Sequence, residues 1–241
     1  MTSGTLRFVI LAAGIALGGM FVGGGFARGR AVDRTVSVKG VAERTAEADL
    51  AIWPLRVVAA ADDLARANQA LQASVQKVRE FVARQGLDSA HLVLQDFGVT
   101  DALAQYSGGS NVGRRFVVRQ TVIIRSTEPK KVQAASQHLA ELVRDGVVLS
   151  SGGEYGNGGP TLVFSGLNAL KPAMISEATA HAREAAEQFA HDSHSTLGGI
   201  RTANQGVFEI LPRDQANGIS EESQITKTVR VVSTIDYSLG R

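Results

Sequence analysis

The sequence of 241 residues contains no cysteine, which excludes disulfides, thiol catalysis and cysteine-ligated metal sites. Aromatic residues make up only 5% of the chain, and Trp53 is the single tryptophan. We interpret Trp53 as a core residue rather than a ligand-stacking one, because aromatic side chains usually serve packing. The 25 basic and 23 acidic residues nearly balance, and no basic run interleaves with aromatics, so we expect no nucleic-acid partner. The 44% hydrophobic content is typical of a globular protein.

Charged residues are absent from positions 8–27. About twenty residues are enough to cross the hydrocarbon core of a bilayer as a helix. The segment is therefore either an uncleaved signal anchor in the inner membrane or a cleaved signal peptide, with Gly25 and Ala27 as small residues near the cleavage site. We favour the anchor, because the apolar run is longer than a usual signal-peptide core. We expect residues 1–30 to form this segment and residues 31–241 to form one exported domain.

The rest of the chain alternates between strand-like and helix-like patterns. Helices interleave with pairs of strands, which predicts an α+β fold with mixed, mainly antiparallel sheets and helices packed on one side. We expect a turn at Glu43–Thr45 between the first two strands, and a strand 92–100 with Val93, Phe97 and Val99 on one face. The expected strands are 35–40, 48–59, 92–100, 114–126, 147–150, 161–164, 199–211 and 225–239, and the expected helices are 63–85, 128–145 and 165–191.

The longest predicted helix, residues 165–191, is rich in alanine, the best helix former. Ser165 or Asn168 can cap its start, Pro172 lies near that start, and the glycines at 198–199 follow its end. Apolar residues at three- and four-residue steps predict one buried face. The residues of this expected face are Ile175, Ala178, Ala182, Ala185, Ala186 and Phe189.

Patterns that indicate chemistry are scarce. His191 and His194 are three residues apart with Asp192 between them, and a metal site there competes with a polar, frayed helix end. The glycine-rich segment 152–159 superficially resembles a phosphate loop, but it lacks the lysine and hydroxyl that a nucleotide loop needs. No G-x-S-x-G elbow of an α/β-hydrolase occurs. We therefore predict no catalytic, cofactor-binding or metal-binding residue, no cofactor, and no enzymatic activity.

Several short motifs occur in a familiar order. Residues 36–42 read VSVKGVA and residues 47–51 read EADLA. The later motifs are Phe164-Ser165, the helical positions Ala178, Ala182-Arg183, Ala185-Ala186 and Phe189-Ala190, then LGGI at 197–200 and a valine-rich terminal strand. Over residues 32–239 the chain resembles the SIMPL-domain family of bacterial periplasmic proteins. That family includes oxidative-stress-defence proteins and a periplasmic immunogenic protein.

The resemblance implies an α+β fold, a periplasmic location, no established catalytic residues and, in some members, ring-like homo-oligomers. Our first hypothesis is a non-enzymatic, self-assembling protein of the cell envelope that contributes to oxidative-stress tolerance, with strands such as 225–239 pairing between copies. A periplasmic ligand- or partner-binding module that uses the 152–159 segment is the alternative. An envelope hydrolase or metal enzyme that uses His191 and His194 is a third hypothesis.

Overall fold

The computed structural model describes residues 14, 18–20, 34–88, 92–105, 113–150 and 159–240. The predicted membrane segment 8–27 therefore lies almost entirely outside the described residues, as does the glycine-rich segment except Gly159. No helix within the described ranges is long and apolar enough to span a membrane. The chain divides into two compact units: a larger unit of Val41–Ala178 with Gly206–Val232, and a smaller unit of Met1–Gly40, Thr179–Gln205 and Ser233–Arg241.

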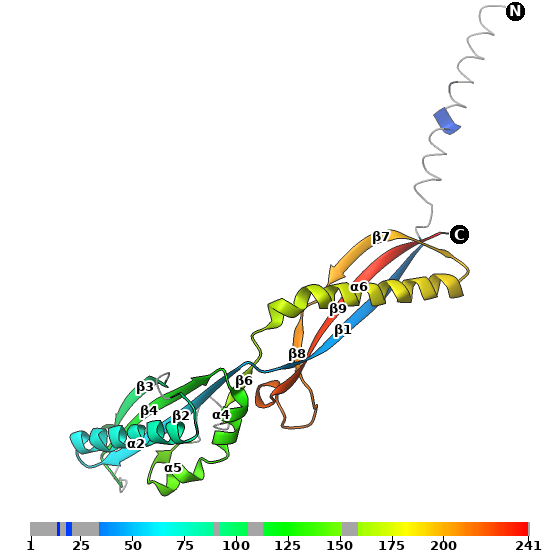
Figure 1. The fold of residues 1–241 in the computed structure, drawn as a ribbon. Helices are drawn as coiled ribbons and strands as arrows, with labels where there is room; N and C mark the ends of the chain where they lie inside the picture. Colours follow the sequence, from blue (N-terminus) through cyan, green and yellow to red (C-terminus); the bar gives the residue numbers. More distant parts are fainter. Residues whose placement is uncertain are drawn as a thin grey trace, which may run out of the picture. The chain divides into compact units, whose positions relative to one another are not determined.

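The larger unit contains a five-stranded antiparallel sheet (Figure 1). Strand β4 (Phe116–Ser126) lies between β3 (Leu92–Asp101) and β2 (Leu50–Ala61), and the far side of β2 pairs with β5 (Val148–Leu149) and β6 (Thr161–Val163). Pro54 falls between the segments of β2 that pair with β5 and β6. Among the described strands, only β4 lies beside β2 at Pro54, which suits proline because it has no N–H to donate to a sheet ladder.

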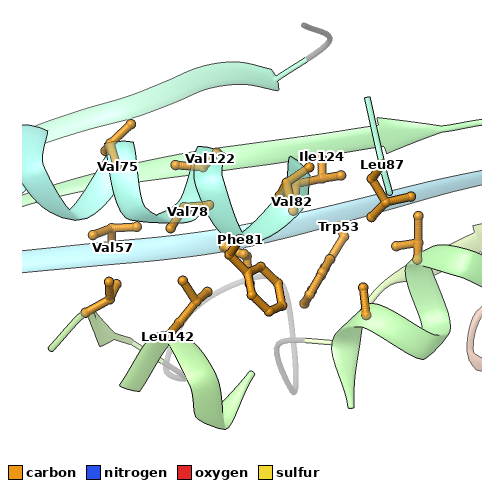
Figure 2. Packing of buried hydrophobic residues seen from close by; sticks show 14 of the residues in the cluster. Trp53, Val57, Val75, Val78, Phe81, Val82, Leu87, Val122, Ile124 and Leu142 are labelled. Atoms are coloured by element: carbon orange, nitrogen blue, oxygen red, sulfur yellow. The ribbon is translucent and has the colours of Figure 1, made fainter. Parts of the chain in front are cut away.

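Helix α2 (Leu64–Arg84) covers one face of this sheet. Asp63 caps its first turn by accepting a hydrogen bond from the Arg66 amide at 3.0 Å. Figure 2 shows Phe81 and neighbouring α2 side chains pointing toward Trp53 and Val122 of the sheet. The Trp53 and Phe81 rings meet edge to face with centroids 6.5 Å apart, and Trp53 is fully buried. Trp53 is therefore a core residue, as predicted.

Two short helices complete this core, where one helix over 128–145 was expected. They are α4 (Pro129–Ser136) and α5 (Ala140–Arg144), and they bury Val132 and Leu142 in the same cluster. Between them, the amides of Gln137 and His138 bond carbonyls three residues earlier, which tightens the chain into turns. The four-residue helix α3 (Ala102–Gln105) directly follows β3.

A second, four-stranded sheet has β9 (Thr226–Gly240) in its interior. β1 (Thr35–Glu47) lies on one side of β9, while β7 (Thr196–Gln205) and β8 (Glu209–Pro212) pair with successive parts of its other side. The short 3₁₀ helix η2 (Glu221–Ser223) precedes β9. The hypothesis that the terminal strand pairs with another copy is therefore wrong, since β9 already has neighbours on both sides.

Two boundary predictions for this sheet are also wrong. The turn expected at Glu43–Thr45 is part of β1, which lies beside β9. There Glu43 lies 3.4 Å from Arg230 of β9, and the exposed Arg44 pairs with Glu177 of α6 at 2.7 Å. The single strand expected over 199–211 is two strands, β7 and β8. Between them the Gly206 amide bonds the Val232 carbonyl at 2.8 Å, and a Cβ there would lie 2.6 Å from that oxygen.

Helix α6 (Leu167–Asp192) contributes to both units. In the larger unit Met174 and Ala178 pack with Ala42, Val229 and Val231. In the smaller unit Ala182 and Ala186 pack with Val36, Ile235 and Tyr237. The buried positions recur every fourth residue, so the prediction that Ala185 and Phe189 are buried is wrong, and Phe189 is 51% exposed. Alanines occupy several faces of this helix, and hydropathy alone could not identify the row that meets the sheet.

Candidate interaction surface

The predicted histidine pair lies at the C-terminal end of α6. His191 is exposed, and its Nδ1 lies 3.2 Å from Asp192 Oδ1. Asp192 also accepts hydrogen bonds from Gln188 Nε2, and these contacts, led by that of Gln188, lower the pKa of the Asp192 carboxyl. Across the described ranges, no group of three or more histidine, aspartate or glutamate side chains is placed to hold a metal ion. The structure thus brings His191 to Asp192 but adds no third ligand.

Strand β3 exposes several large apolar side chains to solvent. It lies at an edge, since it pairs with β4 alone among the described strands. We call its four exposed large apolar residues, together with Leu103 of α3, the apolar strip. The exposed fractions are 46% for Val93, 38% for Leu94, 55% for Phe97, 47% for Val99 and 58% for Leu103. Side chains of this size are usually buried, so a group of five along one edge marks a candidate interaction surface.

A β-bulge divides the strip. The register between β3 and β4 shifts between Gln95 and Gly98, and Asp96 has a φ of 51°. Because of the extra residue, Val93 lies opposite Ile123 whereas Val99 lies opposite Val118. Ile123 and Val118 are on different faces of β4, so the prediction that Val93 and Val99 share a face is wrong. A bulge also hinders the addition of a further strand, because it interrupts the row of free backbone groups.

Arg115 makes an ion pair and a cation–π contact at the end of β3. Arg115 forms an ion pair with Asp101 at 3.1 Å, and its guanidinium lies 4.7 Å from the centroid of the Phe116 ring. The hydrogen bond from Arg115 lowers the pKa of the Asp101 carboxyl below its ordinary value. This contact positions the last residue of β3, and with it the C-terminal end of the apolar strip.

The sheet face opposite α2 carries a concavity of about 670 Å³ beside the strip. It is lined by residues of three strands and by Ser150. Arg56 and Val58 come from β2, Val117 and Arg119 from β4, and Asp96, Phe97 and Gly98 from the bulge of β3. Sequence analysis missed this site. The alternation of β4 places Arg119 on the other face of the strand from the buried Val118. No pattern in the chain predicts the bulge that brings Phe97 and Asp96 beside Arg119.

A buried lysine is the other feature that sequence analysis missed. The side chain of Lys227 is fully buried, forms an ion pair with Glu221 of η2 and donates a hydrogen bond to the Glu221 carbonyl at 2.6 Å. The burial of Lys227 could have been inferred from β9, since Lys227 lies on the same face of the strand as the buried Val229 and Val231. A buried charge is tolerated only with such partners, and so Lys227 fixes η2 to the start of β9.

Residues 36–234 match a family model described as SIMPL, a protein family of unknown function also called DUF541. The chain belongs to the SIMPL family. No curated protein matches the chain. Among solved structures, it is similar to an uncharacterized conserved protein from Listeria innocua, with 13% sequence identity over 78% of this chain and 90% of that one and a TM-score of 0.14. The resemblance inferred from the sequence motifs is thus confirmed at the level of the family.

Proposed function

We propose that this SIMPL protein is a non-enzymatic, self-assembling component of the cell envelope, and that its copies associate through the apolar strip. The observation that carries the proposal is the exposure of the five strip residues along the edge of a sheet. Removing apolar surface from water favours association by about 25 cal/mol per Å² buried. A surface of this kind can bind another copy of itself, because apolar side chains need no complementary charge.

The bulge at Asp96 determines how such a contact would form. A second copy cannot extend the sheet along the whole of β3, since the row of backbone groups is interrupted there. We therefore propose contact through the side chains of the strip, chiefly Phe97 at its centre. Large aromatic side chains near the centre of an interface usually contribute most of its binding energy. The ring-like assemblies implied by the family resemblance support the same interpretation.

The sedimentation of the purified full chain in a neutral detergent tests the proposal. We expect an oligomer for the natural sequence, and a shift toward the monomer when Phe97→Ser and Val99→Thr are combined. Both residues are exposed, so the variant should keep its fold. The matched control is Phe189→Ser on α6, a phenylalanine of similar exposure in the smaller unit. A natural protein that stays monomeric at high concentration, or a control that dissociates equally, would contradict the proposal.

We further propose that the protein works in the periplasm, held at the inner membrane by residues 8–27. The uncharged run of that length supports this location. N-terminal sequencing of protein purified from the envelope distinguishes an anchor, which retains Met1, from a cleaved signal peptide. For the role in oxidative-stress tolerance, we expect a deletion strain to be more sensitive to peroxide. The natural gene should restore tolerance, and the Phe97→Ser/Val99→Thr gene should not.

A further inference from the structure

A second concavity lies between helix α4 and the connection from β8 to β9, residues 213–225, which we call the β8–β9 loop. We propose that this concavity binds a neutral sugar that carries an acetamido group. Its lining comes from Gln133 of α4, from the loop and from Thr226 at the start of β9, all within the larger unit. None of the lining residues belongs to the apolar strip, so the inference is independent of self-assembly.

Hydrogen bonds hold the base of the β8–β9 loop in one conformation. The side-chain amide of Gln224 accepts a hydrogen bond from the Asp214 N–H at 3.1 Å and donates one to the Asp214 carbonyl at 2.9 Å. The buried Lys227 holds Glu221 through an ion pair and a hydrogen bond to its carbonyl. The two ends of the loop are therefore positioned before any ligand binds, and little chain entropy is lost when one does.

The charges of the lining favour a neutral ligand. The charged residues of the described lining are Arg213 and Asp214, which have opposite signs, and Arg213 Nε lies 3.9 Å from Asp214 Oδ1. Both side chains are more than half exposed, so water screens the field of each charge. An anion or a cation would be attracted by one of these groups and repelled by the other. A ligand without net charge avoids this repulsion.

The uncharged polar groups of the lining are amides and hydroxyls. Gln133 and Gln224 supply the amides, and Ser223 and Thr226 supply the hydroxyls. A glutamine amide has two N–H donors and an oxygen with two lone pairs, and Gln224 uses one of each on Asp214. Within the described ranges, the side chain of Gln133 has no hydrogen-bond partner. Donors and acceptors thus remain for a ligand that offers both, as the hydroxyls of a sugar do.

Two isoleucines provide the apolar part of the lining. Ile219 is 42% exposed, and Ile225 packs partly against the core cluster of the larger sheet. A patch of this size suits a methyl group rather than a ring or a long alkyl chain. An acetamido group combines a methyl with an amide, and that amide can both donate to and accept from a glutamine side chain. The volume of about 390 Å³ suits a single sugar, since ligand pockets usually measure about 300–1,000 Å³.

Saturation-transfer NMR tests this site with N-acetylglucosamine as the probe, on the purified full chain in a detergent without a sugar headgroup. We expect saturable binding of N-acetylglucosamine and much weaker binding of glucose, which lacks the acetamido group. Gln133→Ala should weaken N-acetylglucosamine binding about fivefold, the loss expected for one net hydrogen bond. The matched control is Gln137→Ala, which removes an exposed glutamine at the end of the same helix but outside the concavity, and should bind like the natural protein.

Three results would overturn the proposal: no saturable N-acetylglucosamine binding, equal binding of glucose, or equal losses in Gln133→Ala and Gln137→Ala. Equal binding of N-acetylglycinamide would reject a sugar as the ligand class, since the site would then recognise an amide alone. Circular dichroism shows whether each variant is folded. If Gln133→Ala is not, Thr226→Val serves the same test, because it removes a lining hydroxyl and keeps the shape of the side chain. Gln133→Ala should sediment like the natural protein, which separates the failure of this site from the failure of self-assembly.

Discussion

The two longest helices in the described part of the chain, α2 and α6, pack on their sheets with different side chains. α2 buries leucine, valine and phenylalanine against Trp53 and its neighbours, and this cluster is the largest in the described part of the molecule. α6 buries alanine, with a single methionine, in a row that repeats every four residues. Long side chains fill space between a helix and a sheet, whereas alanines let the helix lie close to the strands.

The difference indicates which kind of mutation each of the two helix contacts tolerates least. A fully buried leucine, valine or phenylalanine contributes about 1.5–3 kcal/mol by its removal from water, and its loss leaves a cavity. An alanine contributes less, but no room is left beside it for a larger residue. The α2 core should therefore be damaged most by truncation, and the α6 contact by enlargement.

The largest expected effect is that of Phe81→Ala. Phe81 is fully buried against Trp53, and truncation of such a phenylalanine costs about 3–5 kcal/mol in the free energy of unfolding. Fluorescence of Trp53 during urea denaturation measures this change, because it is the single tryptophan and lies in the same cluster. Phe189→Ala is the control and should change stability by less than about 0.5 kcal/mol, since Phe189 is exposed. Equal effects of the two would refute the described packing.

The next effect in size is that of Ala182→Leu. Ala182 is fully buried beside Ile235 and Tyr237, and an added isobutyl group there should cost about 1–3 kcal/mol. Far-ultraviolet circular dichroism during denaturation follows the loss. Ala185→Leu adds the same group on an exposed face of α6 and should be nearly neutral. If Ala185→Leu were the more damaging change, the row of buried alanines would be assigned wrongly.

The smallest effect concerns Thr121 of β4. Its side chain is 2% exposed, and its hydroxyl has no hydrogen-bond partner in the described part of the chain. Thr121→Val keeps the shape and removes this unsatisfied group, so we expect a gain of about 1 kcal/mol in the free energy of unfolding. Chemical denaturation followed by Trp53 fluorescence measures it. A loss of stability would mean that the hydroxyl has a partner in the folded protein.

Much of the fold was predictable because its signals are local. The alternation in β2, β4 and β9 and the apolar stripe of α2 each follow the period of one element, and the structure contains them near the expected bounds. The row that α6 buries was not predictable, since alanine is neutral enough to lie on any face. Nor was the continuation of β1 through Glu43–Thr45, because β1 lies beside β9, a strand distant in the sequence.

The candidate surfaces were harder to predict than the fold. In the sequence, the apolar strip resembles an ordinary half-buried strand. Its exposure depends on β3 being the outermost strand of the sheet, and the sequence does not show the strand order. The concavity depends on one bulge, and the sequence around Asp96 carries no standard signal for it apart from Gly98. The histidine pair was recognised, yet a metal site depends on ligands from other elements, which a spacing of three residues does not supply.

Strand β9 supplies buried residues to the clusters of both units, and this places an unusual constraint on how the gene can change. Val229 and Val231 belong to one cluster, and Ile235 and Tyr237 to the other. Side chains on a strand alternate between faces, so a codon lost or gained early in β9 would turn the following residues over. Asp236 would then point where Tyr237 now lies. Insertions and deletions should accumulate over evolution in the loop before residue 226, and substitutions alone within the strand.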